Sequence, residues 1–171
     1  MACTLINSFP FACRDSNGGV AEMKVKVFNS ALLDAGIAET SGTVTMSSSA
    51  LTGWKTYYCA KQTVSGTDAG TTNVQNGTSM YTQTVNFIYN KLQVSFRNDL
   101  KVLAQNSVWI AMKDNNGTSW LFGWKRGMDL TTSSSETGTN FEDRSGYVLT
   151  FTGGEPEPMP SISNYSALID A

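Results

Sequence analysis

Few residues of this chain could carry out chemistry. The sequence contains no histidine, which excludes Ser-His-Asp and Cys-His machinery and most catalytic zinc sites. Its fourteen Asp and Glu residues are scattered, and no spacing marks two of them as a general acid and base. Paired carboxylates and Ser-Lys chemistry stay open in principle, but no pattern points to either. We therefore expect no enzyme, and no catalytic, cofactor-binding or metal-binding residues.

Acidic residues gather loosely in the last third of the chain. The members of this group are Glu136, Glu142, Asp143, Glu155 and Glu157. Such groups usually form solvated surface, which is the interpretation we favour. A calcium site is the alternative, although the ligand spacing of a calcium loop is missing.

The three cysteines, Cys3, Cys13 and Cys59, have no metal-ligand spacing. Their odd number argues against a complete disulfide framework, so reduced thiols in a cytoplasmic setting are expected. A Cys3–Cys13 bridge stays open because ten residues can turn back on themselves.

Six large aromatic residues suggest a second binding hypothesis, a sugar-binding site. They are Trp54, Tyr57, Tyr58, Trp109, Trp120 and Trp124. Together they could form a sugar-binding platform. Most occupy alternating strand positions, however, which favours packing in a core.

Composition indicates one β-rich domain over residues 1–171. Apolar residues make up 40% and charged residues 15%, and much of the rest is Ser, Thr, Asn and Gly, as in turn-rich β proteins. The net charge is −2, so the basic footprint of a tight nucleic-acid binder is missing and any contact with nucleic acid should be loose or repulsive. The first residues lack the basic region and long apolar segment of a secretory signal or membrane span.

The clearest local element is a β-hairpin between Val108 and Trp124. Val108, Ile110 and Met112 alternate before Asn116-Gly117. Trp120, Phe122 and Trp124 alternate after it. Asn-Gly supplies the positive φ angles of tight hairpin turns.

Five further segments are predicted as strands. They cover residues 20–28, 43–47, 53–64, 79–91 and 147–153. In the first, Met23, Val25 and Val27 should face the core, with Lys24 and Lys26 on the solvent side. Residues 31–39 favour a helical turn broken at Gly36.

A single helix is expected over residues 95–106. Ser95 would cap it, and Phe96, Leu100, Leu103 and Ala104 would form one apolar stripe. The stripe is interpreted as closing the open end of a β-sandwich.

Four segments are expected outside the regular elements. Residues 1–19 form an arm that packs on its own domain or on a neighbouring subunit. Residues 65–79 read as the tip of a long hairpin or a binding loop, and residues 126–146 as a second long loop. Residues 154–171 hold three of the four prolines, so this tail should not continue a sheet interior. We expect an extended tail that either wraps its own domain or reaches a neighbouring subunit.

Five stretches run through most of the chain, and none is a catalytic signature: CRDSNGGVAEMKV (13–25), NGTSMYTQTV (76–85), LKVLAQN (100–106), DNNGTSWLFGW (114–124) and DRSGYVLTFTGGEPEP (143–158). These stretches resemble structural proteins of phages of gut Bacteroidetes. The layout of two β-hairpins with one helix between them, an N-terminal arm and long polar loops resembles the tail tube (major tail) proteins of long-tailed bacteriophages.

The resemblance implies a mainly β fold, a β-sandwich or barrel of two packed sheets with one flanking helix. It also implies a virion protein that is assembled in the host cytoplasm into stacked, commonly hexameric rings. Its partners would be further copies of itself, other tail proteins and genomic DNA passing transiently through the lumen, with no cofactor and no membrane. Strands 53–64 and 79–91 would line the shared barrel, with loop 65–79 contacting a neighbour.

Two other classes stay open. A capsid decoration protein would share this β-rich, histidine-free profile. A carbohydrate-binding β-sandwich would expose tryptophans on one sheet face.

Overall fold

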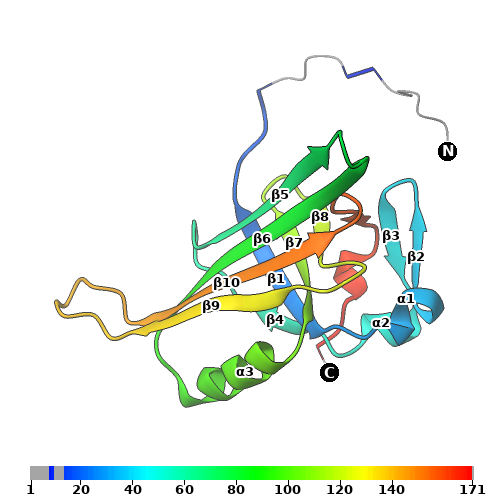
Figure 1. The fold of residues 1–171 in the computed structure, drawn as a ribbon. Coiled ribbons are helices and arrows are strands. Elements are labelled where there is room, and N and C mark those ends of the chain that lie inside the picture. Colours follow the sequence, from blue (N-terminus) through cyan, green and yellow to red (C-terminus); the bar gives the residue numbers. More distant parts are fainter. Residues whose placement is uncertain (1–7, 10–13, 171) are drawn as a thin grey trace.

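The chain folds as two packed β-sheets with few helices (Figure 1). The structure is a computed structural model that describes residues 8–9 and 14–170, apart from the side chain of Ser48. The expected mainly β sandwich is confirmed, and the two sheets do not close into a barrel. Most of the predicted arm, and Cys3 and Cys13 with it, lies outside the described residues.

The larger sheet has seven strands in the order β2-β3-β11-β8-β7-β1-β4. Their bounds are β1 (Val20–Val27), β2 (Ile37–Thr40), β3 (Thr43–Met46), β4 (Lys55–Tyr57), β7 (Val108–Asp114), β8 (Ser119–Phe122) and β11 (Ser161–Ile162). Short helices α1 (Ala31–Ala35), α2 (Ser48–Leu51) and η1 (Tyr165–Ala167) accompany it. As expected, α1 ends at Gly36.

The predicted hairpin is confirmed as β7 and β8. Gly117 has a φ of +89°, and Asp114 Oδ1 accepts the backbone N–H groups of Asn116 and Thr118 at 2.9 and 2.8 Å. Val108 to Met112 of β7 are all buried, because both faces of this strand are covered. The alternation therefore separates two cores: Trp109 and Trp124 pack in the second core and Trp120 packs against the first.

The smaller sheet has four antiparallel strands in the order β5-β6-β10-β9. They are β5 (Val64–Asn73), β6 (Thr78–Asn90), β9 (Asp129–Glu136) and β10 (Gly146–Glu155). Strands β6 and β10 confirm the segments predicted over 79–91 and 147–153.

Three boundaries in the prediction were wrong. Residues 65–73 are strand and only 74–77 form the turn, so the predicted loop over 65–79 is the distal part of a hairpin. Residues 129–136 of the loop predicted over 126–146 form β9, which has few apolar residues because it is an exposed edge. The strand predicted over 53–64 is only β4, which belongs to the other sheet.

The first core lies between the two sheets. Met23, Val25, Ile110, Met112 and Phe122 come from the larger sheet, and Val85, Phe87, Leu149 and Phe151 from the smaller one. Burying each such side chain contributes roughly 1.5–3 kcal/mol. This core holds the four-stranded sheet in place and leaves its opposite face to the surroundings.

Helix α3 (Val94–Gln105) confirms the predicted helix and lies at one end of the sandwich (Figure 1). Phe96 and Leu103 are buried, and Phe96 stacks on Tyr89 with ring centroids 4.5 Å apart. Two details of the helix prediction, its N-cap and the width of its apolar stripe, were wrong. Gln93 is at the N-cap and no side chain caps the helix, because the helix begins one residue before Ser95. Ala104 is exposed, so the apolar stripe is narrower than expected.

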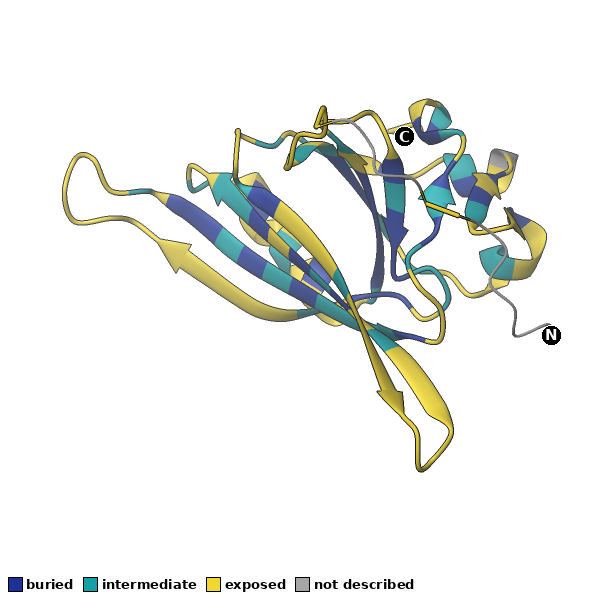
Figure 2. Ribbon diagram, turned by 90° about the horizontal axis from the view of Figure 1, so that it is seen from above, coloured by how far each residue is buried: buried dark blue, intermediate teal, exposed yellow. Residues whose placement is uncertain are grey.

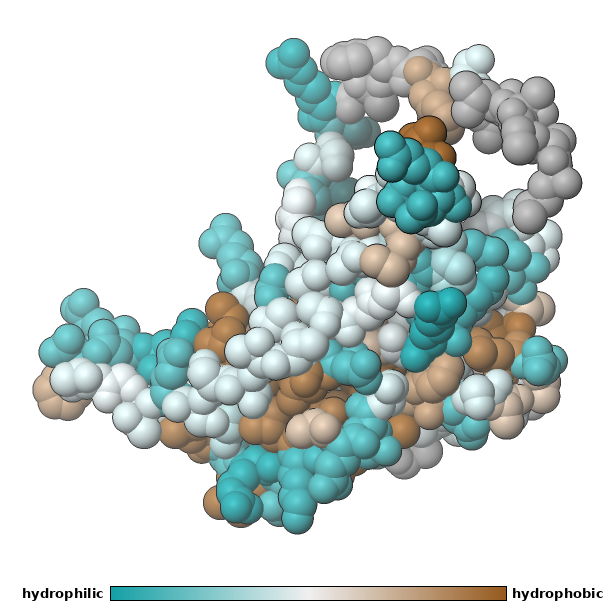
Figure 3. Space-filling model, in the orientation of Figure 1, coloured by the Kyte–Doolittle hydropathy of each residue, from teal (hydrophilic) through white to brown (hydrophobic). Residues whose placement is uncertain are grey.

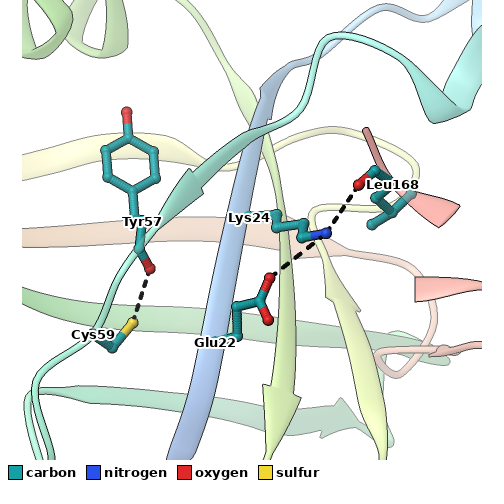
Figure 4. Close-up of polar contacts among 5 residues, drawn as sticks. All are labelled: Glu22, Lys24, Tyr57, Cys59 and Leu168. Carbon is teal, nitrogen blue, oxygen red and sulfur yellow. Dashed lines mark hydrogen bonds and ion pairs between the residues drawn. The ribbon is translucent and has the colours of Figure 1, made fainter. Parts of the chain in front are cut away.

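The second core covers the other face of the seven-stranded sheet. It contains Trp54 and Trp109, which are 0% and 1% exposed, together with Val44, Met46, Ala50, Ala111, Leu121, Ile162, Tyr165 and Leu168. Lys24 faces this core, so its predicted solvent position was wrong. Its Nζ donates to the Leu168 carbonyl at 2.9 Å and lies 3.6 Å from Glu22 (Figure 4).

Lys26 and the C-terminal tail also depart from prediction. Lys26 Nζ donates to the Ala50 carbonyl at 3.1 Å, and burial lowers the pKa of this lysine. The tail wraps its own domain, as one of the two alternatives predicted, but it also supplies β11, which lies between β3 and β8 inside the larger sheet. Prolines did not prevent this because they precede Ser161 and Ile162, which make the pairing.

Candidate assembly surfaces

The four-stranded sheet ends on both sides in a strand that has no further described strand beside it, although α3 contacts part of β9. Within the described residues, β5 pairs only with β6, and β9 only with β10. Strand β9 is exposed along its length except for half-buried Leu130, and β5 is exposed except for Val64 and Asp68. Open edge strands present unpaired N–H and C=O groups, which proteins normally protect. These edges are therefore candidates for pairing with another chain.

The two edges are offset along the strand direction. Strand β5 lies alongside Thr78 to Phe87 of β6. Strand β9 pairs with Gly146 to Thr152 of β10, which face Asn90 to Thr84 of β6. Along the strand direction, the two edges therefore overlap only beside Thr84 to Phe87 of β6.

Small polar side chains make up most of the face of this sheet that points away from the core, and Met80, Ile88 and Val148 are its larger apolar residues. Because Gln83, Val85 and Phe87 face inward, the register places rows such as Ser65, Asn86, Thr150 and Thr132 on the outside. Thr150 Oγ1 and Asn86 Oδ1 lie 3.0 Å apart. We call this the outer face; it is the broad pale band of intermediate hydropathy in Figure 3.

The four strands of this sheet contain no lysine or arginine. All twelve basic residues of the chain lie in other segments. Four acids belong to the sheet: Asp68 and Glu155 face inward, and Asp129 and Glu136 lie on β9. The strands of this sheet therefore place no positive charge on the outer face that would attract a phosphate backbone.

Two exposed projections extend from this sheet in different directions (Figure 2). One is the distal β5–β6 hairpin, where residues 69–80 are all exposed. The other is the connection from β9 to β10, residues 137–145, which we call the tip loop. Phe141 in the tip loop is fully exposed.

Three inward polar side chains tie the four-stranded sheet to the rest of the molecule. Gln83 Oε1 accepts Gly123 N–H at 2.8 Å, and Asp68 Oδ2 accepts Met159 N–H at 2.7 Å. Glu155 accepts the N–H groups of Lys125 and Arg126 at 3.2 and 2.9 Å. The sequence prediction missed all three roles, since a polar residue among strand residues gives no sign of the backbone it will meet.

Glu155 should make stability depend on pH. It is 2% exposed, and burial raises the pKa of its carboxyl above the usual value, against the opposing effect of the Arg126 and Lys125 N–H groups. The folded state then holds its proton to higher pH than the unfolded state, so stability is lost as pH rises above about 4.5. Glu155→Gln should flatten this decline in urea unfolding series at several pH values. Glu142→Gln has the same net charge and should keep it; equal slopes in the two variants would contradict the assignment.

The acidic residues of the last third of the chain do not form one site; most of those described make separate ion pairs or hydrogen bonds. Arg144 pairs with Glu136 at 2.7 Å and Lys125 with Glu157 at 2.8 Å. Asp143 accepts the Thr139 and Asn140 N–H groups, which lower the pKa of its carboxyl. No group of three or more potential metal ligands occurs among the described residues, and so the calcium alternative gains no support.

The aromatic residues do not form a sugar platform. None of the four tryptophans is exposed: Trp54 and Trp109 are buried, and Trp120 and Trp124 are half-buried. Tyr58 is the exception among the six candidates, at 84% exposed. Packing in the cores, which the sequence favoured, is confirmed for the tryptophans.

Cys59 is free and half-buried, with its Sγ 3.3 Å from the Tyr57 carbonyl oxygen (Figure 4). Burial raises the pKa of this thiol to about 11. Thiolate is the reactive form, so Cys59 is a poor nucleophile at neutral pH.

Within residues 8–9 and 14–170, no helix has the length and apolar character needed to cross a membrane. Comparison with protein-family models, with curated proteins and with solved structures gave no match.

Proposed function

We propose that this protein is a virion structural protein whose copies join into stacked rings, most simply hexamers, that form a phage tail tube. The observation that carries this proposal is the pair of open, mutually offset edges of the four-stranded sheet. A closed ring of copies removes such edges by continuing one sheet from protomer to protomer. The sequence resemblance to tail tube proteins supports the same assembly.

The offset of the edges has a geometric consequence. Bringing β9 of one copy fully alongside β5 of the next requires a shift of about four to five residues, or ~15 Å along the strands, for every ~19 Å of sheet width. The strands then lean at roughly 40° to the ring axis, within the tilt range of closed β-barrels. The protomer thus carries a stagger suited to a barrel shared between copies.

In such a ring the outer face would line the lumen. Ser, Thr and Asn side chains without any basic residue would let a DNA duplex pass without being retained. DNA is then a transient and non-specific partner, and other tail proteins cap the stack. The sequence led us to expect residues 53–64 and 79–91 in the lining of the barrel. In this proposal the lining consists of β5, β6, β9 and β10, so residues 79–91 (β6) stay in it and most of residues 53–64 do not.

Negative-stain microscopy of the purified protein at high concentration tests the proposal. Rings or hollow tubes are expected. Dispersed particles that attach to capsids would indicate a decoration protein instead, and monomers that bind glycans would indicate a carbohydrate-binding module. Either of the last two results would overturn the proposal.

The distal β5–β6 hairpin should be required for tubes but not for folding. Replacing residues 72–79 with Asn-Gly keeps the Thr71–Met80 pair and removes only exposed residues. The variant should unfold thermally near the midpoint of the full chain, because Val64, Val85 and Phe87 of the core are unchanged. It should form no tubes under the microscope. Tubes of normal length would show that this projection makes no contact between copies.

A further inference from the structure

The tip loop is the most exposed aromatic feature of the described chain. Phe141 at its apex touches nothing, although exposed large aromatic side chains gain much from burial. The loop is nevertheless firmly built. Asp143 Oδ2 accepts the N–H groups of Thr139 and Asn140 at 2.9 and 2.7 Å, and Arg144 closes its base on Glu136. A loop held in one shape loses little entropy when it binds.

A recess of about 230 Å³ lies near the opposite edge of the same sheet. Its walls come from β4, from the end of β6 and from the first turn of α3. They include Tyr57, Tyr58, Tyr89, Phe96, Gln93 and Asp99. Phe96 stacks on Tyr89 and meets Tyr57 edge-on at 5.9 Å between centroids, so the recess is an aromatic cluster open on one side.

We propose that Phe141 of one copy inserts into the recess between Tyr58 and Tyr89 of the adjacent copy. The occupant is thus a second copy of this chain, and this inference rests on the proposed ring. A projection at one edge and a hollow at the other form a heterologous contact, in which every protomer gives one group and receives one.

The register of the sheet supports this pairing. When β9 is centred on β5 of the next copy, Glu136 comes level with about Asn86 of that copy's β6. Phe141 follows five residues later in the chain, within reach of the level of Tyr89. At that level β5 has not yet begun, since it starts at Val64 opposite Phe87, so the recess is open to an approaching loop.

Charge at the recess is mixed. Asp99 lines it, and Lys61 is exposed in the connection between β4 and β5. The loop carries Glu142 and Asp143. The contact should therefore depend on aromatic burial more than on attraction between charges, and added salt should weaken it little.

Two variants test the contact from its two sides. Phe141→Ala removes the inserted ring, and Tyr58→Asp places a carboxylate at the rim of the recess. Both residues are exposed, so each variant should fold as the original chain does. Each alone should weaken self-association roughly 30-fold, as expected for a central aromatic contact. Val102→Ala, another exposed apolar truncation, is the control and should have no effect.

Mixing the two variants gives the sharper result. The Tyr58→Asp copy keeps its loop and the Phe141→Ala copy keeps its recess, so one intact contact can form. Sedimentation velocity should show heterodimers in the mixture and monomers in each variant alone. A mixture that stays monomeric while the wild type associates would overturn the proposal.

The outcome also separates this inference from the proposed function. Tubes that form normally from Phe141→Ala would reject the inserted ring and leave the tube standing. Wild-type dimers without rings or tubes, lost in Phe141→Ala, would support the contact and reject the tube. A wild type that remains monomeric at every concentration would reject both.

Discussion

A chain that ends at Pro160 is expected to lose its cooperative unfolding transition. The missing segment supplies β11 between β3 and β8, so its removal splits the seven-stranded sheet. It also removes Ile162, Tyr165 and Leu168 from the second core, where they are 3–7% exposed. At roughly 1.5–3 kcal/mol for each buried side chain, the loss is about 5–9 kcal/mol, comparable to the whole stability of a typical domain.

Calorimetry and near-ultraviolet circular dichroism would measure this loss. The matched control is a chain that ends at Ile169, which keeps all three buried side chains and removes only the last two residues. It should unfold close to the full-length midpoint. A synthetic peptide of residues 160–171 should restore the transition of the truncated chain when added in excess. An unchanged transition without the peptide would mean that the tail is only a surface covering.

Much of the fold follows from local sequence pattern. Period-two or helical alternation, together with turn residues, predicted most of the regular elements. These are β1, β3, β6, β7, β8 and β10, the helix α3 and the Asn-Gly turn. Such signals are strong where one face of an element is buried and the other is wet. The two-sheet architecture could be predicted for the same reason.

The elements and contacts that the sequence did not predict share a different physical origin: they depend on residues far away in the chain or on exposed edges. Strand β9 and the distal part of β5 are edges made mostly of Ser, Thr and other small or polar residues, so no alternation of apolar and polar residues marks them. Apolar and polar residues alternate around Lys24, as in a strand with one face in solvent. The second core nevertheless covers the polar face, and the Leu168 carbonyl accepts a hydrogen bond from the lysine. Pairing over a separation of 118 residues, as between Thr43 and Ser161, leaves no local trace.

The candidate surfaces could be predicted only in part, for the same reason. The sequence marked residues 65–79 and 126–146 as long polar segments, and these do contain the two open edges and both projections. Their roles as strands depend on partners elsewhere in the chain. The lack of basic residues on the outer face becomes visible only when β5, β6, β9 and β10 are known to lie side by side.

In the proposed tube, a lysine on the outer face of the four-stranded sheet should make the assembly retain DNA that the unmodified assembly would release. Asn86 is exposed at the middle of this face, between Ser65 and Thr150. Asn86→Lys would place one added positive charge per copy, or about six per hexameric ring, along the path of the duplex. Wild-type tubes should not co-sediment a short linear duplex at low salt, and Asn86→Lys tubes should. Contacts to six or more phosphates would make this retention about a thousandfold weaker between 50 and 200 mM salt.

The shape of the DNA distinguishes a lumen from an outside surface. A short linear duplex can enter a tube from its end, whereas a closed circular plasmid cannot. Asn86→Lys tubes should therefore retain the linear duplex and not the plasmid, and Asn86→Ser tubes should retain neither. Equal retention of both DNAs by the lysine variant would place the outer face on the exterior of the assembly and reverse the proposed orientation of the protomer, because only an external surface is open to a closed circle.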